Sequence, residues 1–449
     1  MTQSRPVLFQ KTDRLDQMPF ADSIDQIKKI QIAQVMQEWP SSEIHSIDGY
    51  LHQVLSRIQL PSAKNGETVG VAVGSRGIDQ LATVVRQCID FLKSLGYSPV
   101  IIPAMGSHGG ARDDGQRAVL ASFGITEASM GAKIDASMDT IQIGELSPDF
   151  PVYFSRAAHD VDHLVVINRI KPHTKFQGPV ESGLCKMMSI GLGKAKGAGI
   201  YHQKAVEHGF SWIPAIAQMV IDQYAVLFGL ALIENQEGHL ANITAVPKHE
   251  IVMREQTLLK TAKTLMPSIP FDCIDILMIN EIGKNISGIG MDSNITGRHR
   301  DIVGDFYNHP HVKRIYVRSL SPQTNGNANG IGLADVIHAS CLESIDFKST
   351  YMNALTALSP EKAAIPLFFH TDKDCLAACL HTLGNPSPQS IRLVWIEHTK
   401  NLKKFFISEG LNSDLNNMNG VSQISDWETI SFDAFGNINH MLNNNLPGY

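Results

Sequence analysis

A pattern of strand, glycine turn and helix occurs twice between residues 68 and 110, and it constrains the fold more than any other feature. The apolar run 68–73 leads into the turn Gly74-Ser75-Arg76-Gly77, after which apolar residues recur at helical spacing up to residue 95. A second apolar run, 99–104, leads into Gly106-Ser107-His108-Gly109-Gly110. Strands that alternate with helices in this way form parallel sheets. The sequence therefore predicts an α/β protein.

The chain of 449 residues is too long for one ordinary core, so two domains are expected. Prolines at 267 and 270 end a helical pattern, and the alternation of strands and helices restarts beyond them. We predict two α/β domains with mainly parallel sheets, 1–268 and 272–449, with the active site at their interface. Residues 1 to about 65 are expected to be a preamble of helix and loop. Further strands are expected at 161–170, 226–233, 274–279, 314–320 and 391–396.

The charge balance excludes several classes of partner. Lysine and arginine number 38 against 44 acidic residues, which gives no basic footprint for nucleic acid. The most apolar stretch, 219–232, is interrupted by polar residues and is shorter than a membrane span. The segment 1–13 lacks the apolar run of a signal peptide. We therefore expect a cytoplasmic protein that binds neither nucleic acid nor membrane.

The densest group of reactive side chains lies between residues 168 and 202, directly after a predicted strand. His173 stands where open α/β sheets place ligand-binding groups, although a lone histidine between lysines is usually a surface residue. Lys186 lies among apolar residues, which requires a buried partner or a lowered pKa. His202 has two open interpretations, a metal ligand or a helix cap. Prolines and glycines between His173 and Lys186 predict a loop rather than a helix.

The two glycine turns supply further candidates. Arg76 is placed to hold a carboxylate with two hydrogen bonds, and the alternative is a solvated arginine. His108 is either catalytic or structural. The glycine-rich run 191–197 fits neither of the common nucleotide-binding spacings. Together, the histidines beside strand ends and the apolar lysine predict an enzyme with a lysine–histidine site.

These residues resemble the motifs of the nickel-dependent lactate racemase family, which includes racemases and epimerases of other 2-hydroxy acids. The resemblance covers mainly residues 65–210. Gly106-Ser107-His108 corresponds to the family's Gly-Thr-His turn, and a second histidine, a glycine-containing loop and a lysine follow as His173 to Lys186. The family's metal-binding histidine lies sixteen residues after that lysine, and His202 stands at this spacing.

The resemblance implies a nickel-pincer cofactor, a pyridinium-derived mononucleotide that holds nickel through carbon and sulfur. Lys186 would tether this group and His202 would ligate the nickel. His108 and His173 would act as acid and base on the substrate hydroxyl, while the cofactor accepts the carbon-bound hydrogen as hydride. Gly74 and Ser75, in the turn beside the cofactor, are the remaining candidates for holding it.

The same resemblance implies a small 2-hydroxy acid as substrate, with Arg76 on its carboxylate and Lys284 and Arg298 as candidate contacts from the carboxyl-terminal half. It also implies that the enzymes that build the cofactor are partners. The family's Asp-x-Thr-Arg-Pro turn is replaced here by Val73-Gly-Ser-Arg-Gly77, and its basic residue after the first histidine by Gly109. These departures favour an acid larger than lactate, such as a sugar acid.

Two other functions remain open on the residues alone. One is a metal-dependent hydrolase in which His108, His173 and His202 surround zinc or a similar ion. The other is a non-catalytic protein that keeps the fold and uses Arg76 to bind a carboxylate.

Overall fold

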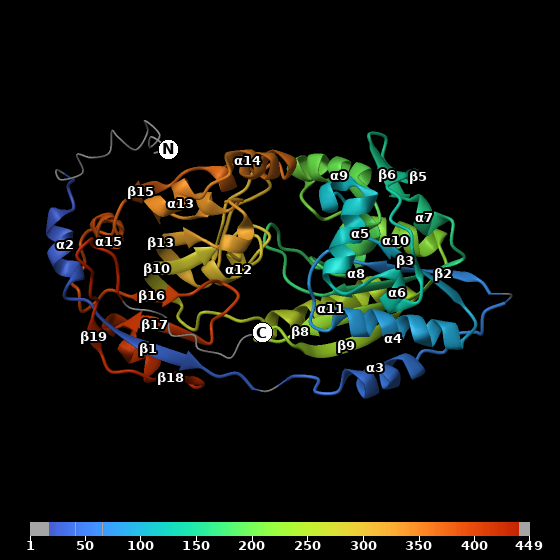
Figure 1. Ribbon diagram of the computed structural model, residues 1–449, viewed down its shortest axis with the longest axis horizontal. Helices are drawn as coiled ribbons and strands as arrows, with labels where there is room; N and C mark the ends of the chain where they lie inside the picture. Colours follow the sequence, from blue (N-terminus) through green and yellow to red (C-terminus); the bar gives the residue numbers. More distant parts are fainter. Residues whose placement is uncertain (1–17, 41, 65, 440–449) are drawn as a thin grey trace.

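The structure, a computed structural model, describes residues 18–439 except residues 41 and 65. Two α/β halves lie side by side along the long axis of the molecule (Figure 1). Over the described residues, one half is built on a six-stranded sheet and the other on a nine-stranded sheet. Both sheets are mixed, with parallel strands at their centres, which confirms the predicted fold class. The segment 1–13, used above to predict the absence of a signal peptide, lies outside the described residues.

The six-stranded sheet forms because its central strands are apolar along their whole length. In spatial order its strands are β4 (Lys133–Ile134), β3 (Ser98–Pro103), β2 (Thr68–Val73), β7 (His163–Arg169), β8 (Val226–Glu234) and β9 (Leu240–Pro247). Val71 and Val165 enter the core on one face, and their neighbours Ala72 and Val166 enter the core on the other. Burial on both faces explains why these strands have continuous apolar runs rather than alternating patterns.

Helices cover both faces of this sheet, and a small hairpin extends from it. The helices are α3 (Ile47–Ser56), α4 (Leu81–Ser94), α5 (Asp113–Ser122), α6 (Glu127–Met130), α7 (Arg156–His159), α8 (Leu184–Lys186), α9 (Lys194–His208), α10 (Ile213–Gln223) and α11 (Ile251–Thr264), and the hairpin pairs β5 (Thr140–Ser147) with β6 (Phe150–Ser155). No helix lies between β7 and α8, as the prolines and glycines of that segment predict. In no described helix are length and apolar character together sufficient for a membrane span.

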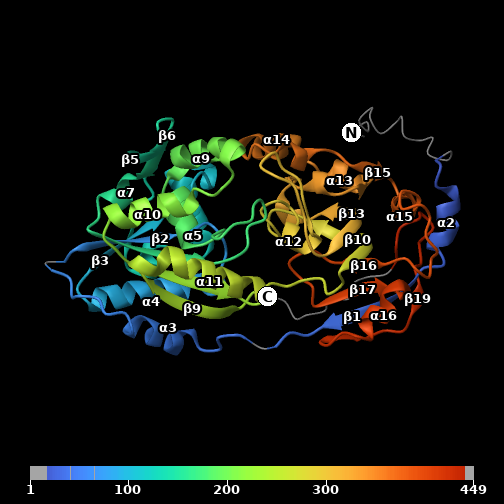
Figure 2. The ribbon, with the colours of Figure 1, turned by 180° about the vertical axis from the view of Figure 1, so that it is seen from behind.

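The nine-stranded sheet forms the other half. Its strands, in spatial order, are β15 (Leu367–Phe369), β14 (Val336–His338), β13 (His311–Leu320), β10 (Cys273–Ile282), β16 (Leu393–Ile396), β17 (Lys404–Ser408), β1 (Gln31–Gln37) and β18 (Val421–Gln423), and β19 (Glu428–Thr429) also pairs with β1. Its helices are α2 (Ala21–Ile27), α12 (Ser293–Thr296), α13 (Ala339–Glu343), α14 (Phe347–Thr356), α15 (Asp372–His381) and α16 (Asn412–Leu415), with a short ribbon of β11 (Arg298–His299) and β12 (Phe306–Tyr307). The chain passes from α11 to β10 between the two halves (Figure 2).

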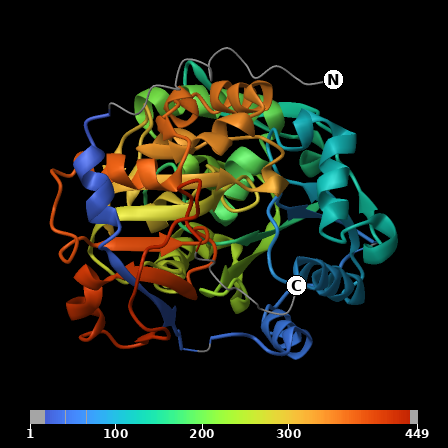
Figure 3. The ribbon, with the colours of Figure 1, turned by 60° about the vertical axis from the view of Figure 1, so that its left-hand side comes forward.

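The amino-terminal residues differ from the sequence-based expectation. The expected preamble of helix and loop contains β1, which lies in the carboxyl-terminal sheet, antiparallel to β17. Ile32 and Val35 are fully buried there, and α2 packs against α15. Figure 3 shows this blue segment among the orange and red elements of the carboxyl-terminal half. The division at residue 268 therefore has to be corrected, because residues 18–37 pack with the half that follows it.

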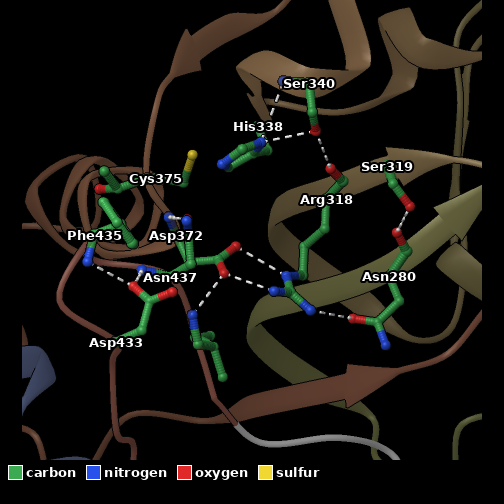
Figure 4. A network of polar contacts seen from close by, with 12 residues as sticks. Asn280, Arg318, Ser319, His338, Ser340, Asp372, Cys375, Asp433, Phe435 and Asn437 are labelled. Atoms are coloured by element: carbon green, nitrogen blue, oxygen red, sulfur yellow. Dashed lines mark hydrogen bonds and ion pairs between the residues drawn. The ribbon is translucent and has the colours of Figure 1, made fainter. Parts of the chain in front are cut away.

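A buried ion pair fixes the carboxyl-terminal segment to the second sheet. The Asp372 carboxylate, whose side chain is 2% exposed, accepts from Nη2 of Arg318 at 2.7 Å and from the backbone amide of Ile438 at 2.8 Å. Nη1 of Arg318 donates to Oδ1 of Asn280 at 3.1 Å (Figure 4). Because these charges are paired with one another, this network at the ends of β10 and β13 is structural.

We predict that Ile32→Ala lowers the free energy of unfolding by about 2–5 kcal/mol, the usual cost of truncating a buried isoleucine. Ile32 is fully buried in a core that also contains Met278 and Trp395. Gln31→Ala, on the half-buried neighbour, should cost no more than about 0.5 kcal/mol. Urea unfolding of both variants provides the measurement. Equal losses would contradict the packing of β1 in this core.

Candidate functional site

A cavity of about 700 Å³ lies between the two halves, at the carboxyl ends of strands from both sheets. The turns after β2, β3 and β7 form one wall, and the loops after β10 and β16 form the opposite wall. In each sheet the strand order reverses beside a central strand, which is β2 in the six-stranded sheet and β10 in the nine-stranded sheet. Open α/β sheets bind ligands at such a switch point. The cavity is lined by all but one of the sequence-predicted site residues: Gly74, Ser75, Arg76, His108, His173, Lys186, His202 and Lys284.

His108 follows β3 in a turn that is held from two sides. Its Nδ1 atom is hydrogen-bonded to the hydroxyl of Ser75, from the turn after β2. The buried amide of Gln116 donates to the backbone oxygens of Gly106, at 2.9 Å, and of His108, at 3.3 Å. Solvent reaches the imidazole through the cavity, yet the surrounding protein and the positive charge of Arg76 lower its pKa to about 4. The ring is therefore neutral near pH 7.

His173 lies in the long loop after β7, and its backbone amide donates to Oε2 of Glu181 at 2.6 Å. Glu181 is almost fully buried and also binds Nζ of Lys263 at 2.8 Å. The amide of Lys175 donates to Nδ1 of His173 at 3.1 Å. Burial and the nearby charge of Lys186 lower the pKa of His173 well below its usual value. This imidazole is also neutral near pH 7.

Lys186 ends α8, a single helical turn whose amino end is fixed by Glu255 of α11. Oε2 of Glu255 accepts from the amide of Cys185 at 2.8 Å, and Nδ2 of Asn168 donates to the oxygen of Gly183 at 3.0 Å. Over the described residues, the Lys186 ammonium has no hydrogen bond or ion pair and lies 5.9 Å from the Phe176 ring centroid. Burial and the charge of Arg76 lower its pKa to about 7. A large share of Lys186 is thus a free amine at neutral pH.

His202 projects from α9, the next α-helix after the turn that carries Lys186. Its Nδ1 atom is buried and has no hydrogen-bond partner within the described part of the chain. Burial, with the charges of Lys175 and Lys186, lowers the pKa of His202 to about 4. A neutral imidazole with an uncommitted nitrogen is the form that binds metals. The free amine of Lys186 and this ring therefore fit a metal-containing cofactor.

Arg76 and Lys284 meet across the cavity from opposite halves. A methyl group added at Gly288 would lie 2.9 Å from Nη2 of Arg76, so the loop after β10 reaches this guanidinium. Nζ of Lys284 donates to the oxygen of Gly288 and to Oδ1 of Asn353, each at 2.6 Å. Burial and the charge of Arg76 lower the pKa of Lys284 to about 8. No described carboxylate pairs with either cation, so their arrangement favours an anionic ligand.

Arg298 is the predicted residue that the structure does not bring to the cavity. It is 8% exposed, and its Nη1 atom pairs with Oδ2 of Asp335 at 2.6 Å. Its Nη2 atom donates to the backbone oxygens of Val312 and Lys313 at 3.0 and 3.1 Å. These partners all belong to the carboxyl-terminal half, so they hold the Arg298 side chain within that half and away from the cavity lining.

Two acidic residues that position the site were missed by the sequence analysis. Glu181 fixes the backbone of His173, and Glu255 fixes the turn that carries Lys186. Glu255 lies on α11, about seventy residues from its partner, and no local pattern marks it. The one feature that could have indicated it is that Glu255 occupies a position on the apolar face of its helix. Many surface helices also have an acidic residue at such a position.

By sequence, no protein-family model and no curated protein matches the chain. Solved structures with some likeness include a Thermotoga maritima protein from a structural genomics consortium, with 14% identity, a TM-score of 0.46, and coverage of 62% of this chain and 72% of the other. Another is the lactate racemase apoprotein of Thermoanaerobacterium thermosaccharolyticum, with 11% identity, a TM-score of 0.43, and coverage of 82% and 89% respectively. TM-scores this low, at such low identity, say nothing about the activity of this chain.

We predict that Lys186 reacts with an amine-directed reagent such as trinitrobenzenesulfonate with a midpoint near pH 7. Only the free amine is nucleophilic, so labelling should be slow below pH 7 and reach its plateau above it. An unperturbed lysine would have its midpoint near 10.4. Peptide mapping of the labelled protein across pH 5–11 measures this midpoint, and Lys186→Arg identifies the peptide. A midpoint near 10 would contradict the lowered pKa.

Proposed function

We propose that the protein is an isomerase, a racemase or epimerase of a 2-hydroxy acid that uses a nickel-pincer nucleotide. The observation that carries this proposal is the convergence of His108, His173, Lys186 and His202 on one cavity. Two of these side chains, Lys186 and His202, have reactive nitrogen atoms without partners in the described chain. This combination suits the attachment of a cofactor and is unusual for a purely structural site.

Lys186 and His202 would hold the cofactor, with the turn of Gly74 and Ser75 beside it. The Lys186 amine is the nucleophile for a covalent attachment, because burial keeps much of it unprotonated. The neutral His202 ring would bind the nickel, and a nitrogen ligand suits nickel(II). When bound, the cofactor would supply the acceptor for the hydrogen on the substrate carbon.

His108 and His173 would act on the hydroxyl group of the substrate. Both rings are neutral near pH 7. His108 can accept the hydroxyl proton as the hydroxyl carbon becomes a carbonyl. His173, whose Nδ1 accepts from the amide of Lys175, would donate a hydrogen bond from its Nε2–H to the same oxygen. His108 returns the proton when the carbonyl is reduced again. Since the intermediate keto acid is planar, return of hydrogen to its other face inverts the stereocentre.

Arg76 and Lys284 would hold the substrate carboxylate between the two halves. Both are cations without a described carboxylate partner, and they come from opposite walls of the cavity. The cavity volume of about 700 Å³ leaves room for an acid larger than lactate beside a mononucleotide. A sugar acid or another substituted 2-hydroxy acid is therefore the substrate class that we propose.

The alternative functions explain less of this arrangement. A hydrolase with a three-histidine metal site needs its ligands clustered, and no group of three or more His, Cys, Asp or Glu side chains in the described chain has a metal-binding arrangement. A carboxylate-binding protein would use Arg76 and Lys284 but would leave the free amine of Lys186 without a purpose. Racemisation accounts for all of these residues.

We predict that Arg76→Ala weakens substrate binding by roughly 10- to 100-fold, because one charge-assisted hydrogen bond contributes about 1.5–3 kcal/mol. Calorimetric titration with a panel of 2-hydroxy acids measures the effect. Arg112→Ala is the matched control, since Arg112 is 71% exposed and its side chain pairs with Asp114, outside the cavity. Equal affinity for both variants would contradict a role for Arg76 in binding.

The proposal as a whole is tested with protein produced together with the enzymes that build the cofactor. Metal analysis, an absorption spectrum and intact mass should show nickel and one added nucleotide, and Lys186→Ala should remove the added mass. If the nucleotide proves to be attached elsewhere, or if Lys186→Ala binds it normally, the assignment of Lys186 is wrong.

Substrate deuterated at the reacting carbon should keep most of its label through inversion in ordinary water, because only the hydroxyl proton passes through His108. Replacement of His108 or His173 by Asn should slow turnover by about 10²–10⁴-fold and leave the cofactor bound. Mass spectrometry of the recovered acid measures label retention. Rapid loss of deuterium in step with inversion would rule out hydride transfer, even in an active racemase.

A further inference from the structure

The loop that carries His173 belongs to the amino-terminal half by sequence but is held by the carboxyl-terminal half. Nζ of Lys171 pairs with Oδ2 of Asp292 at 3.1 Å. The hydroxyl of Ser293 donates to the backbone oxygen of Thr174 at 2.7 Å. These contacts flank His173 on both sides, so its backbone position depends on how the two halves are docked as well as on Glu181.

Lys175 makes the most deeply buried of these contacts. It is 8% exposed, and its Nζ atom donates to the backbone oxygen of Ala357 at 2.8 Å and to the hydroxyl of Ser359 at 3.0 Å. The same atom lies 3.3 Å from Oδ2 of Asp301. All three partners belong to the carboxyl-terminal half, so the side chain of Lys175 crosses the interface completely.

The anchor for Lys175 is itself well fixed. Oδ2 of Asp301 also accepts from Nζ of Lys362 at 2.7 Å and from the hydroxyl of Ser359 at 2.6 Å. Burial alone would raise the pKa of Asp301, but Lys362 and these hydrogen bonds lower it to about 2. The carboxylate therefore stays charged throughout the working pH range, and the anchor does not loosen by protonation.

The backbone of Lys175 connects this anchor to the imidazole. Its amide donates to Nδ1 of His173 at 3.1 Å. A backbone amide can only donate, so Nδ1 must be unprotonated, and the proton of the neutral ring must be on Nε2. His108 is different, because its Nδ1 partner is the Ser75 hydroxyl, which can donate or accept. One ring is thus fixed in its tautomer and the other is free to change.

We propose that Lys175 is a positioning residue, through which docking of the carboxyl-terminal half sets the orientation and tautomer of His173. Its side-chain contacts require that the two halves are docked, and its backbone amide then holds the ring through the hydrogen bond to Nδ1. The catalytic importance of this coupling depends on the proposed function, but the coupling itself does not. Opening of the interface would release the ring from its single tautomer.

Nitrogen-15 NMR of protein labelled at histidine tests the proposal without any measurement of activity. His173→Asn identifies the His173 signals by difference. The full-length protein should show the Nε2–H tautomer, and Lys175→Met should show a mixture of both tautomers. Amide exchange over residues 173–178 should accelerate by roughly 10- to 100-fold in this variant, as expected for the loss of charge-assisted hydrogen bonds.

Lys171→Met is the matched control. Lys171 also pairs across the interface, but its amide donates to the oxygen of Ser182 and not to an imidazole. This variant should keep the Nε2–H tautomer of His173. If Lys175→Met fails to fold, Ser359→Ala removes one partner of the Lys175 ammonium and should cause a smaller shift in the same direction.

The proposal would be overturned if folded Lys175→Met kept a single Nε2–H tautomer. The same result in Ser359→Ala would overturn it where only that variant folds. A mixture of tautomers in the unmodified protein would also overturn it. Where racemase activity is present, Lys175→Met should lower kcat more than it raises KM, because the ring and not the carboxylate site is disturbed. A tautomer shift in a protein without racemase activity would support the coupling and refute the proposed function.

Discussion

Unbalanced positive charge is the physical constraint on which the cavity depends. Arg76, Lys186 and Lys284 stand near one another in a space partly closed to water, and no described carboxylate forms an ion pair with any of them. Burial lowers the pKa of Lys186 and Lys284 and keeps the histidines neutral, and each cation adds to this because it disfavours protonation of its neighbours. The same charge attracts anions. Burial and this charge together therefore produce a largely unprotonated amine, neutral imidazoles and a cavity that favours anions.

The topology of the two sheets brings these groups to one place. Parallel strands end at a common edge, so the turns after β2, β3 and β7 lie side by side although their residues are spread over about a hundred positions. The second sheet presents the loops after β10 and β16 to the same cavity. Neither half contains the whole site, because Arg76 and Lys284 come from different halves. Docking of the halves is therefore a condition for forming the cavity.

The strands and the cavity residues could be predicted because their signals are local. The run Thr68–Val73 is apolar throughout and is followed by a glycine turn, and His108 and His173 each follow such a run. Strand β1 lacked this signal, because Gln31 and Gln34 interrupt its apolar residues and its partners are near the other end of the chain. The position of Arg298 outside the cavity lining could not be predicted, because only the fold shows that Asp335 pairs with it. Partners that are distant in sequence leave no trace in a local pattern.

The position of β1 has a consequence for how the protein is made. The ribosome synthesises β1 before the six-stranded half and its partner β17 after it, although Ile32 pairs with Ser408 in the folded protein. The six-stranded half can fold while β1 is still unpaired, since β1 contributes no strand to that sheet. During this interval an apolar strand has both edges open, which is the state most prone to pair with another chain. The faster β10 to β17 follow, the shorter is the time for which β1 lacks its partners.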